Sequence, residues 1–162
     1  MNPYTPEELE RIERLRSANE SFESHFIKQR EDWNNTVNPL FEEIRNVFNI
    51  EKSDKIIEIQ SLALSYRQKI NDQISYYLNR RSREDSKLKK IKQDKFIFYA
   101  ISFGIKTNNS DKLILIEGNI AENERTIQLI DTHIEYLRSC SKNLESLGFT
   151  IKNTIELLNY LK

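Results

Sequence analysis

A heptad pattern near the C-terminus constrains the fold more than any other feature of the chain. From Ile120 to Lys162, apolar residues recur at alternating steps of three and four, the spacing of a helix face that packs against other helices. Gly costs about 1 kcal/mol relative to Ala inside a helix, so we expect a kink or a break at Gly148. The a positions are Ile120, Ile127, Ile134, Ser141, Gly148, Ile155 and Lys162, and the d positions are Asn123, Ile130, Leu137, Leu144, Ile151 and Leu158.

The chain contains few residues that break helices. Its 162 residues include three Gly and three Pro, while 31% are charged and 38% are hydrophobic. With helical spacing along most of its length, this composition predicts a mainly α protein, one domain made of a few long helices. We divide that domain into an N-terminal acidic helical region, residues 1–50, and a second region, residues 51–162.

The first helix is predicted to begin at Thr5-Pro6-Glu7-Glu8. Thr5 is a suitable cap, Pro6 suits the first helical position, and Glu8 completes a capping box. Asn19 and Gln29 interrupt the apolar seam of this helix, so we expect a less continuous partner surface there. Trp33 is expected in the core or an interface. Asn38-Pro39 repeats the start signal, so the helix continues or kinks there and ends near Asn49.

The second helix is predicted from Ser53 or Asp54 to about Arg80. The basic segment that follows, residues 80–95, is interpreted as a linker. Residues 96–105 are rich in aromatic and β-branched side chains, so a short strand or extended segment competes with helix there, and we leave both open. Residues 107–111 supply a turn and caps for the last helix.

Charge is unevenly distributed, although the formal net charge is zero. Residues 1–54 carry seven Lys or Arg and twelve Asp or Glu, whereas residues 80–95 carry eight and three. No apolar run approaches the ~18–20 residues of a membrane span, and the N-terminus does not resemble a signal peptide. The single Cys suits a reducing compartment. We therefore expect a soluble cytoplasmic protein.

The sequence offers little for catalysis. His25 and His133 have no neighbouring ligands at metal-site spacing, and His133 is expected to be a core or flanking residue. Cys140 has no recognisable His partner and is expected to be a buried structural thiol. Three scattered Gly cannot form a phosphate-binding loop. We expect no enzymatic activity, cofactor or metal.

Basic and aromatic residues alternate between Tyr66 and Lys106. Cations neutralise phosphates while aromatic rings stack on unpaired bases, so this combination is typical of single-stranded nucleic-acid binding. A solvated basic linker beside core aromatics explains the pattern equally well. The candidate DNA-binding residues are Arg67, Lys69, Tyr76, Tyr77, Arg80, Arg81, Arg83, Lys87, Lys89, Lys90 and Lys92.

Short motifs over residues 55–162 follow the pattern of a known family. They are Tyr76-Tyr77-Leu78-Asn79-Arg80, residues 109–117, Leu137-Arg138-Ser139-Cys140, and above all Gly148-Phe149-Thr150-Ile151-Lys152-Asn153-Thr154-Ile155. Together they resemble the UvsY family, the recombination mediators of T-even-type phages and their relatives. Residues 1–50 are longer and less recognisable than the family's usual N-terminal part.

The resemblance implies a non-enzymatic mediator that acts in the cytoplasm of an infected bacterial host. It would bind single-stranded DNA and help a phage recombinase to displace the single-stranded-DNA-binding protein. The family's basic residues before the paired tyrosines would fall on Asn71 and Gln73, which departs from the pattern. Arg67 and Lys69 lie close by, and Arg80, Arg81 and Arg83 offer alternative charge.

The resemblance also implies a homo-oligomer, a ring of about six or seven subunits. The heptad seam is the expected interface, through Ile127, Ile130, Ile134, Leu137, Leu144, Ile151, Ile155 and Leu158. The alternative is a coiled-coil structural or assembly protein that does not bind DNA.

Overall fold

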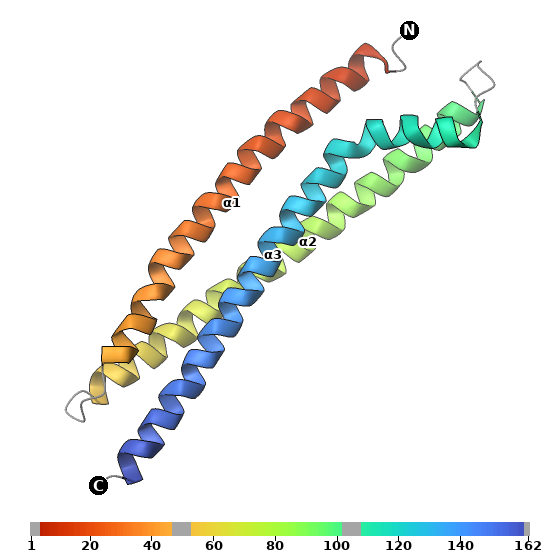
Figure 1. Ribbon diagram of the computed structural model, residues 1–162. Coiled ribbons are helices and arrows are strands. Elements are labelled where there is room, and N and C mark those ends of the chain that lie inside the picture. Colours follow the sequence, from red (N-terminus) through yellow and green to blue (C-terminus); the bar gives the residue numbers. More distant parts are fainter. Residues whose placement is uncertain (1–3, 47–52, 102–107, 161–162) are drawn as a thin grey trace. The chain divides into compact units, whose positions relative to one another are not determined.

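The computed structural model describes residues 4–46, 53–101 and 108–160. They form three long helices, α1 (Pro6–Asn46), α2 (Ser53–Ile101) and α3 (Asn109–Tyr160), coloured in that order from red to blue in Figure 1. Within these ranges there is no strand. The predicted mainly α class is therefore confirmed.

Two helices begin with side-chain caps. At the start of α1, the Thr5 N–H donates to Oε2 of Glu8 at 2.8 Å, and the Glu8 N–H donates to Oγ1 of Thr5 at 3.2 Å. This reciprocal pair is the predicted capping box. At the start of α3, the Asp111 N–H donates to Oδ1 of Asn108 at 2.8 Å. Pro39 lies inside α1, which continues to Asn46.

Residues 80–95 are not a linker, because α2 continues through them to Ile101. Lys and Arg are good helix formers, and Lys87 and Lys89 make ion pairs with Glu84 and Asp85 one turn before them. Leu88 on the same segment is buried. Residues 96–101 are also helical, so the strand reading is wrong there, whereas 102–105 lie outside the described residues.

The expected break at Gly148 is also wrong. α3 runs through Gly148, and the described glycines all lack a positive φ. A Cβ added at Gly148 would meet no atom within 4 Å, so no neighbouring backbone requires glycine there. The helix tolerates Gly148 because burial of its apolar neighbours, Leu144, Leu147 and Ile151, outweighs about 1 kcal/mol of lost helix propensity.

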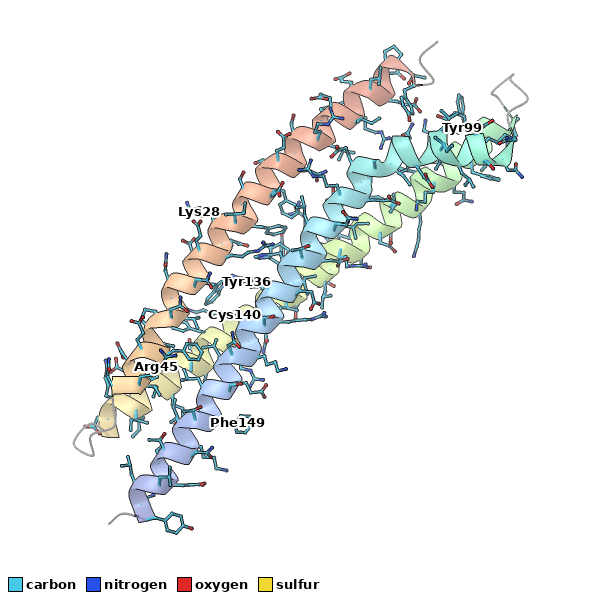
Figure 2. The ribbon with its side chains drawn as sticks, viewed as in Figure 1. Lys28, Arg45, Tyr99, Tyr136, Cys140 and Phe149 are labelled. Carbon is cyan, nitrogen blue, oxygen red and sulfur yellow. The ribbon has the colours of Figure 1, made fainter. Side chains whose placement is uncertain are left out.

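The chain divides into two compact units, each with one segment from every helix. Unit 1 combines Met1–His25 with Leu78–Thr132, and unit 2 combines Phe26–Tyr77 with His133–Lys162. In unit 1, α2 and α3 share an apolar cluster made of Leu88, Tyr99, Ile116, Ile120 and Ile127. Tyr99 is its largest member and is 1% exposed (Figure 2).

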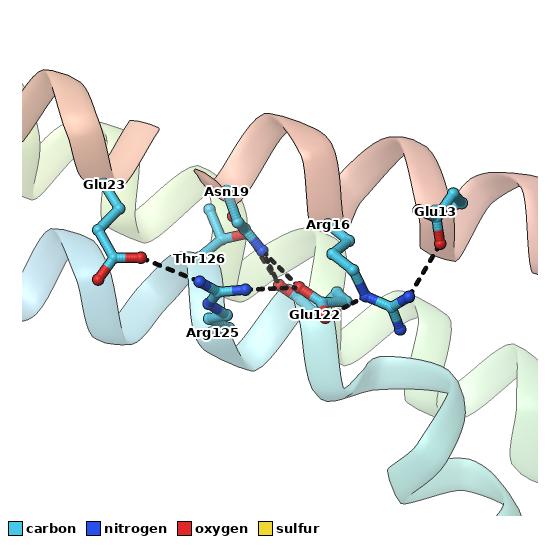
Figure 3. A network of polar contacts seen from close by, with 7 residues as sticks. All are labelled: Glu13, Arg16, Asn19, Glu23, Glu122, Arg125 and Thr126. Carbon is cyan, nitrogen blue, oxygen red and sulfur yellow. Dashed lines mark hydrogen bonds and ion pairs between the residues drawn. The ribbon is translucent and has the colours of Figure 1, made fainter. Parts of the chain in front are cut away.

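A polar network joins α1 to α3 in unit 1 (Figure 3). The Asn19 side chain donates to the Glu122 carbonyl at 2.8 Å, and Oγ1 of Thr126 donates to Oδ1 of Asn19 at 2.7 Å. Arg125 pairs with Glu23 at 2.9 Å. Asn19 is 2% exposed, so the polar break in the predicted seam is a satisfied buried contact that fixes the register of the two helices.

Stacked rings form the centre of unit 2. Phe26 and His133 stack with centroids 4.1 Å apart, and Tyr77 packs edge-on against both rings. His133 is fully buried, as expected of a core histidine. The other interrupting residue of the α1 seam, Gln29, accepts a hydrogen bond from the Tyr77 hydroxyl at 3.0 Å.

The heptad seam of α3 is buried inside the two units. Every described a or d position from 120 to 151 is buried except Gly148, which is half-buried. The preceding positions, Asn119, Thr126, His133, Cys140 and Leu147, are buried as well. The buried stripe is therefore wider than a two-helix seam, because α3 packs against both α1 and α2.

Candidate nucleic-acid interface

All the candidate DNA-binding residues lie on α2, but the two units divide them. Unit 2 holds Arg67, Lys69, Tyr76 and Tyr77. Unit 1 holds Arg80, Arg81, Arg83, Lys87, Lys89, Lys90 and Lys92. The candidate cations of α2 therefore form two groups, one in each unit.

Four unit 1 cations lie along one face of α2, at steps of three and four residues. An α-helix turns by about 100° per residue, so an arc of about 80° on α2 contains all four residues: Arg80, Arg83, Lys87 and Lys90. We call these four residues the basic face. Arg83, Lys87 and Lys90 are exposed, and Arg80 is half-buried with its guanidinium 4.3 Å from the centroid of the Phe22 ring.

Two cations of the basic face carry uncompensated charge. Arg83 and Lys90 make no ion pair with any residue in the described part of the chain. Lys87 pairs with Glu84 at 2.9 Å while remaining 64% exposed. An exposed pair of this kind contributes roughly 0–1 kcal/mol, so Lys87 exchanges its carboxylate for a phosphate at little cost.

The remaining unit 1 cations have structural partners. Nε of Arg81 lies 2.5 Å from Oδ1 of Asp131, and Lys92 pairs with Glu124 at 3.0 Å, so both residues connect α2 to α3. Lys89 donates to Asp85 at 2.8 Å, and this hydrogen bond holds the pKa of the Asp85 carboxyl below its ordinary value. These three cations are less available for phosphates than the basic face.

An aromatic side chain follows the basic face along the helix. Phe98 lies eight residues after Lys90, within the same arc of α2, and is 37% exposed. The ammonium of Lys95 lies 5.4 Å from the centroid of its ring. Asp94, exposed between Lys90 and Phe98, ends the run of positive charge.

In unit 2 the paired tyrosines have different environments. Tyr76 is 59% exposed, whereas Tyr77 is 4% exposed and belongs to the core. Successive residues of a helix point about 100° apart, so of this pair only Tyr76 presents its ring to solvent. Arg67 pairs with Glu145 at 3.0 Å. The ammonium of Lys69 lies 5.8 Å from the centroid of the Tyr66 ring.

The expected oligomer interface is covered within a single chain. Ile127, Ile130, Ile134, Leu137, Leu144 and Ile151 are each at most 9% exposed, and Ile155 and Leu158 are half-buried. Their burial therefore needs no second copy. Among the described residues, no group of His, Cys, Asp or Glu is arranged to hold a metal ion. No described helix is long and apolar enough to cross a membrane.

Cys140 and Tyr136 lie one turn apart on α3 (Figure 2). Burial raises the pKa of the Cys140 thiol, which argues against a reactive thiolate. The Tyr136 hydroxyl donates to the Arg30 carbonyl at 2.9 Å. Burial raises the pKa of the Tyr136 hydroxyl to about 12. Both groups are neutral and structural near pH 7.

Sequence reasoning missed two further features. One is an open apolar groove of about 550 Å³ in unit 1, lined by Lys92, Gln93, Phe96, Ile97, Leu113, Ile116, Glu117 and Ile120. The other is a pocket of about 320 Å³ in unit 2, lined by Gln29, Asp32, Trp33, Thr36, Tyr66, Lys69 and Gln73. We call the second the Trp33 pocket. Its residues come from two helices, so no pattern along the sequence identifies them together.

Comparison of the chain with protein-family models, with curated proteins and with solved structures returns no match.

Proposed function

We propose that this protein binds single-stranded DNA through the basic face of α2 without catalysing a reaction. The observation that carries the proposal is the run of exposed Arg83, Lys87 and Lys90 on one helix face. Two of these cations have no ion pair within the described residues, so a phosphate would gain an attraction without displacing a carboxylate.

The preference for single strands rests on the aromatic ring beyond the cations. A single strand that follows the basic face would meet Phe98 about 27 Å from Arg80, given a rise of 1.5 Å per residue. Unpaired bases stack on exposed aromatic rings, whereas the bases of a duplex are already stacked. We therefore expect tighter binding to single strands than to duplex DNA.

On the resemblance to the UvsY family, we further propose a recombination mediator. In that role a homo-oligomeric ring presents several weak basic faces to one strand, and the high effective concentration supplies the affinity. The mediator would promote loading of a phage recombinase onto strands covered by single-stranded-DNA-binding protein. Because the α3 seam is already covered, such a ring would use exposed apolar surface, for which the unit 1 groove is a candidate.

A matched pair of triple variants tests DNA binding. Arg83→Gln, Lys87→Gln and Lys90→Gln together remove the exposed charge of the basic face. The control triple variant makes the same change of net charge at exposed positions outside α2. It combines Arg14→Gln, Lys142→Gln and Lys152→Gln. Fluorescence anisotropy with a labelled oligothymidylate at low salt should show weaker binding by the first variant only. Equal affinities would contradict the proposal.

A second candidate is a helical assembly protein that does not bind DNA. The ion pairs of Lys87, Lys89 and Lys92 favour it, because neutralised cations are also expected on a solvated helix surface. The exposed Phe96, Ile97 and Leu113 beside the unit 1 groove favour it as well. Wild-type protein that assembles in sedimentation velocity but shows no anisotropy change with oligothymidylate at low salt would establish this candidate.

A further inference from the structure

We propose that the Trp33 pocket receives one unpaired nucleobase of a bound DNA strand, with the adjoining phosphate at Lys69. This inference rests on the proposed binding of single-stranded DNA and adds a base-binding site in unit 2, whereas the basic face belongs to unit 1. The pocket lies between α1 and α2 within unit 2. Its volume of about 320 Å³ is at the lower end of the ~300–1,000 Å³ range of small-molecule sites.

Two aromatic rings form the apolar part of the pocket. Trp33 and Tyr66 are both half-buried, with ring centroids 6.2 Å apart and planes at 73°. Rings at this angle expose different faces, so a flat base can stack on one while the other contacts its edge. Nε1 of Trp33 donates to Oε1 of Gln73 at 3.0 Å, which holds the indole in position before a ligand arrives.

Polar groups surround the rings. The side-chain oxygens of Gln29 and Gln73 already accept hydrogen bonds from Tyr77 and Trp33. Their amide nitrogens have no hydrogen-bond partner in the described ranges, so they remain as donors. Asp32 makes no ion pair within the same ranges and supplies a carboxylate acceptor. Amide donors match the ring nitrogens and carbonyl oxygens of bases, and a carboxylate matches their N–H groups.

The cation of the pocket is placed for a phosphate. Lys69 is exposed, lines the pocket and has no ion pair in the described part of the chain, while its ammonium lies 5.8 Å from the Tyr66 centroid. Asp32 on the opposite helix makes a purely anionic ligand unfavourable inside the pocket. The combination therefore favours a ligand with a flat, neutral polar ring and a separate negative group. A nucleotide, with its base and its phosphate, has these two parts.

Trp33 is the only tryptophan of the chain, so its fluorescence reports directly on the pocket. The probes are an oligothymidylate and an abasic strand with the same number of phosphates. Stacking of a base on Trp33 should quench its emission with the oligothymidylate, whereas the abasic strand should bind with little quenching. Trp33→Leu should weaken oligothymidylate binding by ~5-fold or more, the lower end of what one stacked base contributes.

A charge variant makes the test independent of the indole. Lys69→Gln should weaken binding of the oligothymidylate, while Lys28→Gln, an exposed α1 residue outside the pocket (Figure 2), should not. Binding in anisotropy without tryptophan quenching, or equal quenching by the abasic strand, would overturn the base pocket and leave the basic face intact. Absence of anisotropy binding by both strands would overturn the proposed function and this inference together.

Discussion

Asn19 is a buried polar residue of unit 1 whose contacts help to fix the register of α1 on α3. Its amide and carbonyl groups both have partners on α3, Glu122 and Thr126, so α1 fits α3 in one alignment. The exposed pairs of the same network, such as Arg125 with Glu23, contribute roughly 0–1 kcal/mol each. The buried amide therefore contributes more to the specificity than these exposed pairs do.

Replacement of Asn19 should destabilise the protein more than the loss of a small side chain alone would. Asn19→Ala removes the hydrogen bonds of a buried amide to α3, each of which contributes ~0.5–1.5 kcal/mol. Thr126 and Glu122 keep their other partners. Urea unfolding followed by circular dichroism should show a clearly lower midpoint. Asn35→Ala, at an exposed position of α1, is the control and should leave the midpoint almost unchanged. Equal midpoints for the two variants would contradict this role.

Cys140 should be protected from thiol reagents in the folded protein. Burial raises its pKa above the ordinary value of 9.0, so the folded state keeps its proton to higher pH than the unfolded state does. The linked stability is fully present below pH 9.0 and is lost as the pH rises through the folded-state pKa. We expect slow modification by a chromogenic disulfide at pH 8 and rapid modification in urea. Rapid reaction of the native protein would show that the thiol is accessible.

Among the elements, α3 was the most predictable from sequence, because its seam, its N-terminal cap and its apolar period agree with one another. The buried positions that precede the a residues, Asn119, Thr126, His133, Cys140 and Leu147, carry no such signal, because Asn, Thr and His are polar and do not extend the apolar period. The charge density of residues 80–95 suggests a linker, but charge density alone does not exclude a helix. Lysines at helical spacing with acidic residues one turn away instead extend α2.

Gly148 offers a stabilising substitution within α3. Gly148→Ala should raise stability by about 1 kcal/mol, since the position is helical and an added Cβ meets nothing within 4 Å. For a chain of this size the melting temperature should rise by ~2–4 °C. Gly118→Ala is the comparison, because its Cβ would meet the Tyr4 hydroxyl, which would have to move away, so we expect a smaller gain. A lower melting temperature for Gly148→Ala would contradict the uninterrupted helix.

For the whole molecule, burial of the α3 seam within one chain determines the effect of a charged substitution in that seam. Ile134 is 2% exposed within one chain. An unpaired carboxylate buried there costs several kcal/mol, a large part of a typical free energy of unfolding of ~5–15 kcal/mol. Ile134→Asp should therefore lose helical circular dichroism rather than release folded monomers. Glu135→Asp, on the exposed side of the same turn, should remain folded. A folded monomeric Ile134→Asp variant would show that the seam joins separate chains.

The candidate site was only partly predictable from sequence. The sequence identifies the cations and aromatic residues of α2 as candidates, because the residue type alone marks them. Their separation into the basic face and the structural pairs of Arg81 and Lys92 was not, since Asp131 and Glu124 lie on a different helix. The Trp33 pocket was missed for the same reason, because Trp33 and Tyr66 meet only after α1 and α2 pack together.

The salt dependence of DNA binding tests the central claim most directly. Each phosphate contact on a single strand contributes about −0.7 to the slope of log affinity against log salt. The triple variant Arg83→Gln, Lys87→Gln and Lys90→Gln should therefore have a slope shallower by about 2 than the wild type. The control triple variant at Arg14, Lys142 and Lys152 should keep the wild-type slope. If the basic-face variant keeps the wild-type slope and affinity, this face of α2 does not bind DNA.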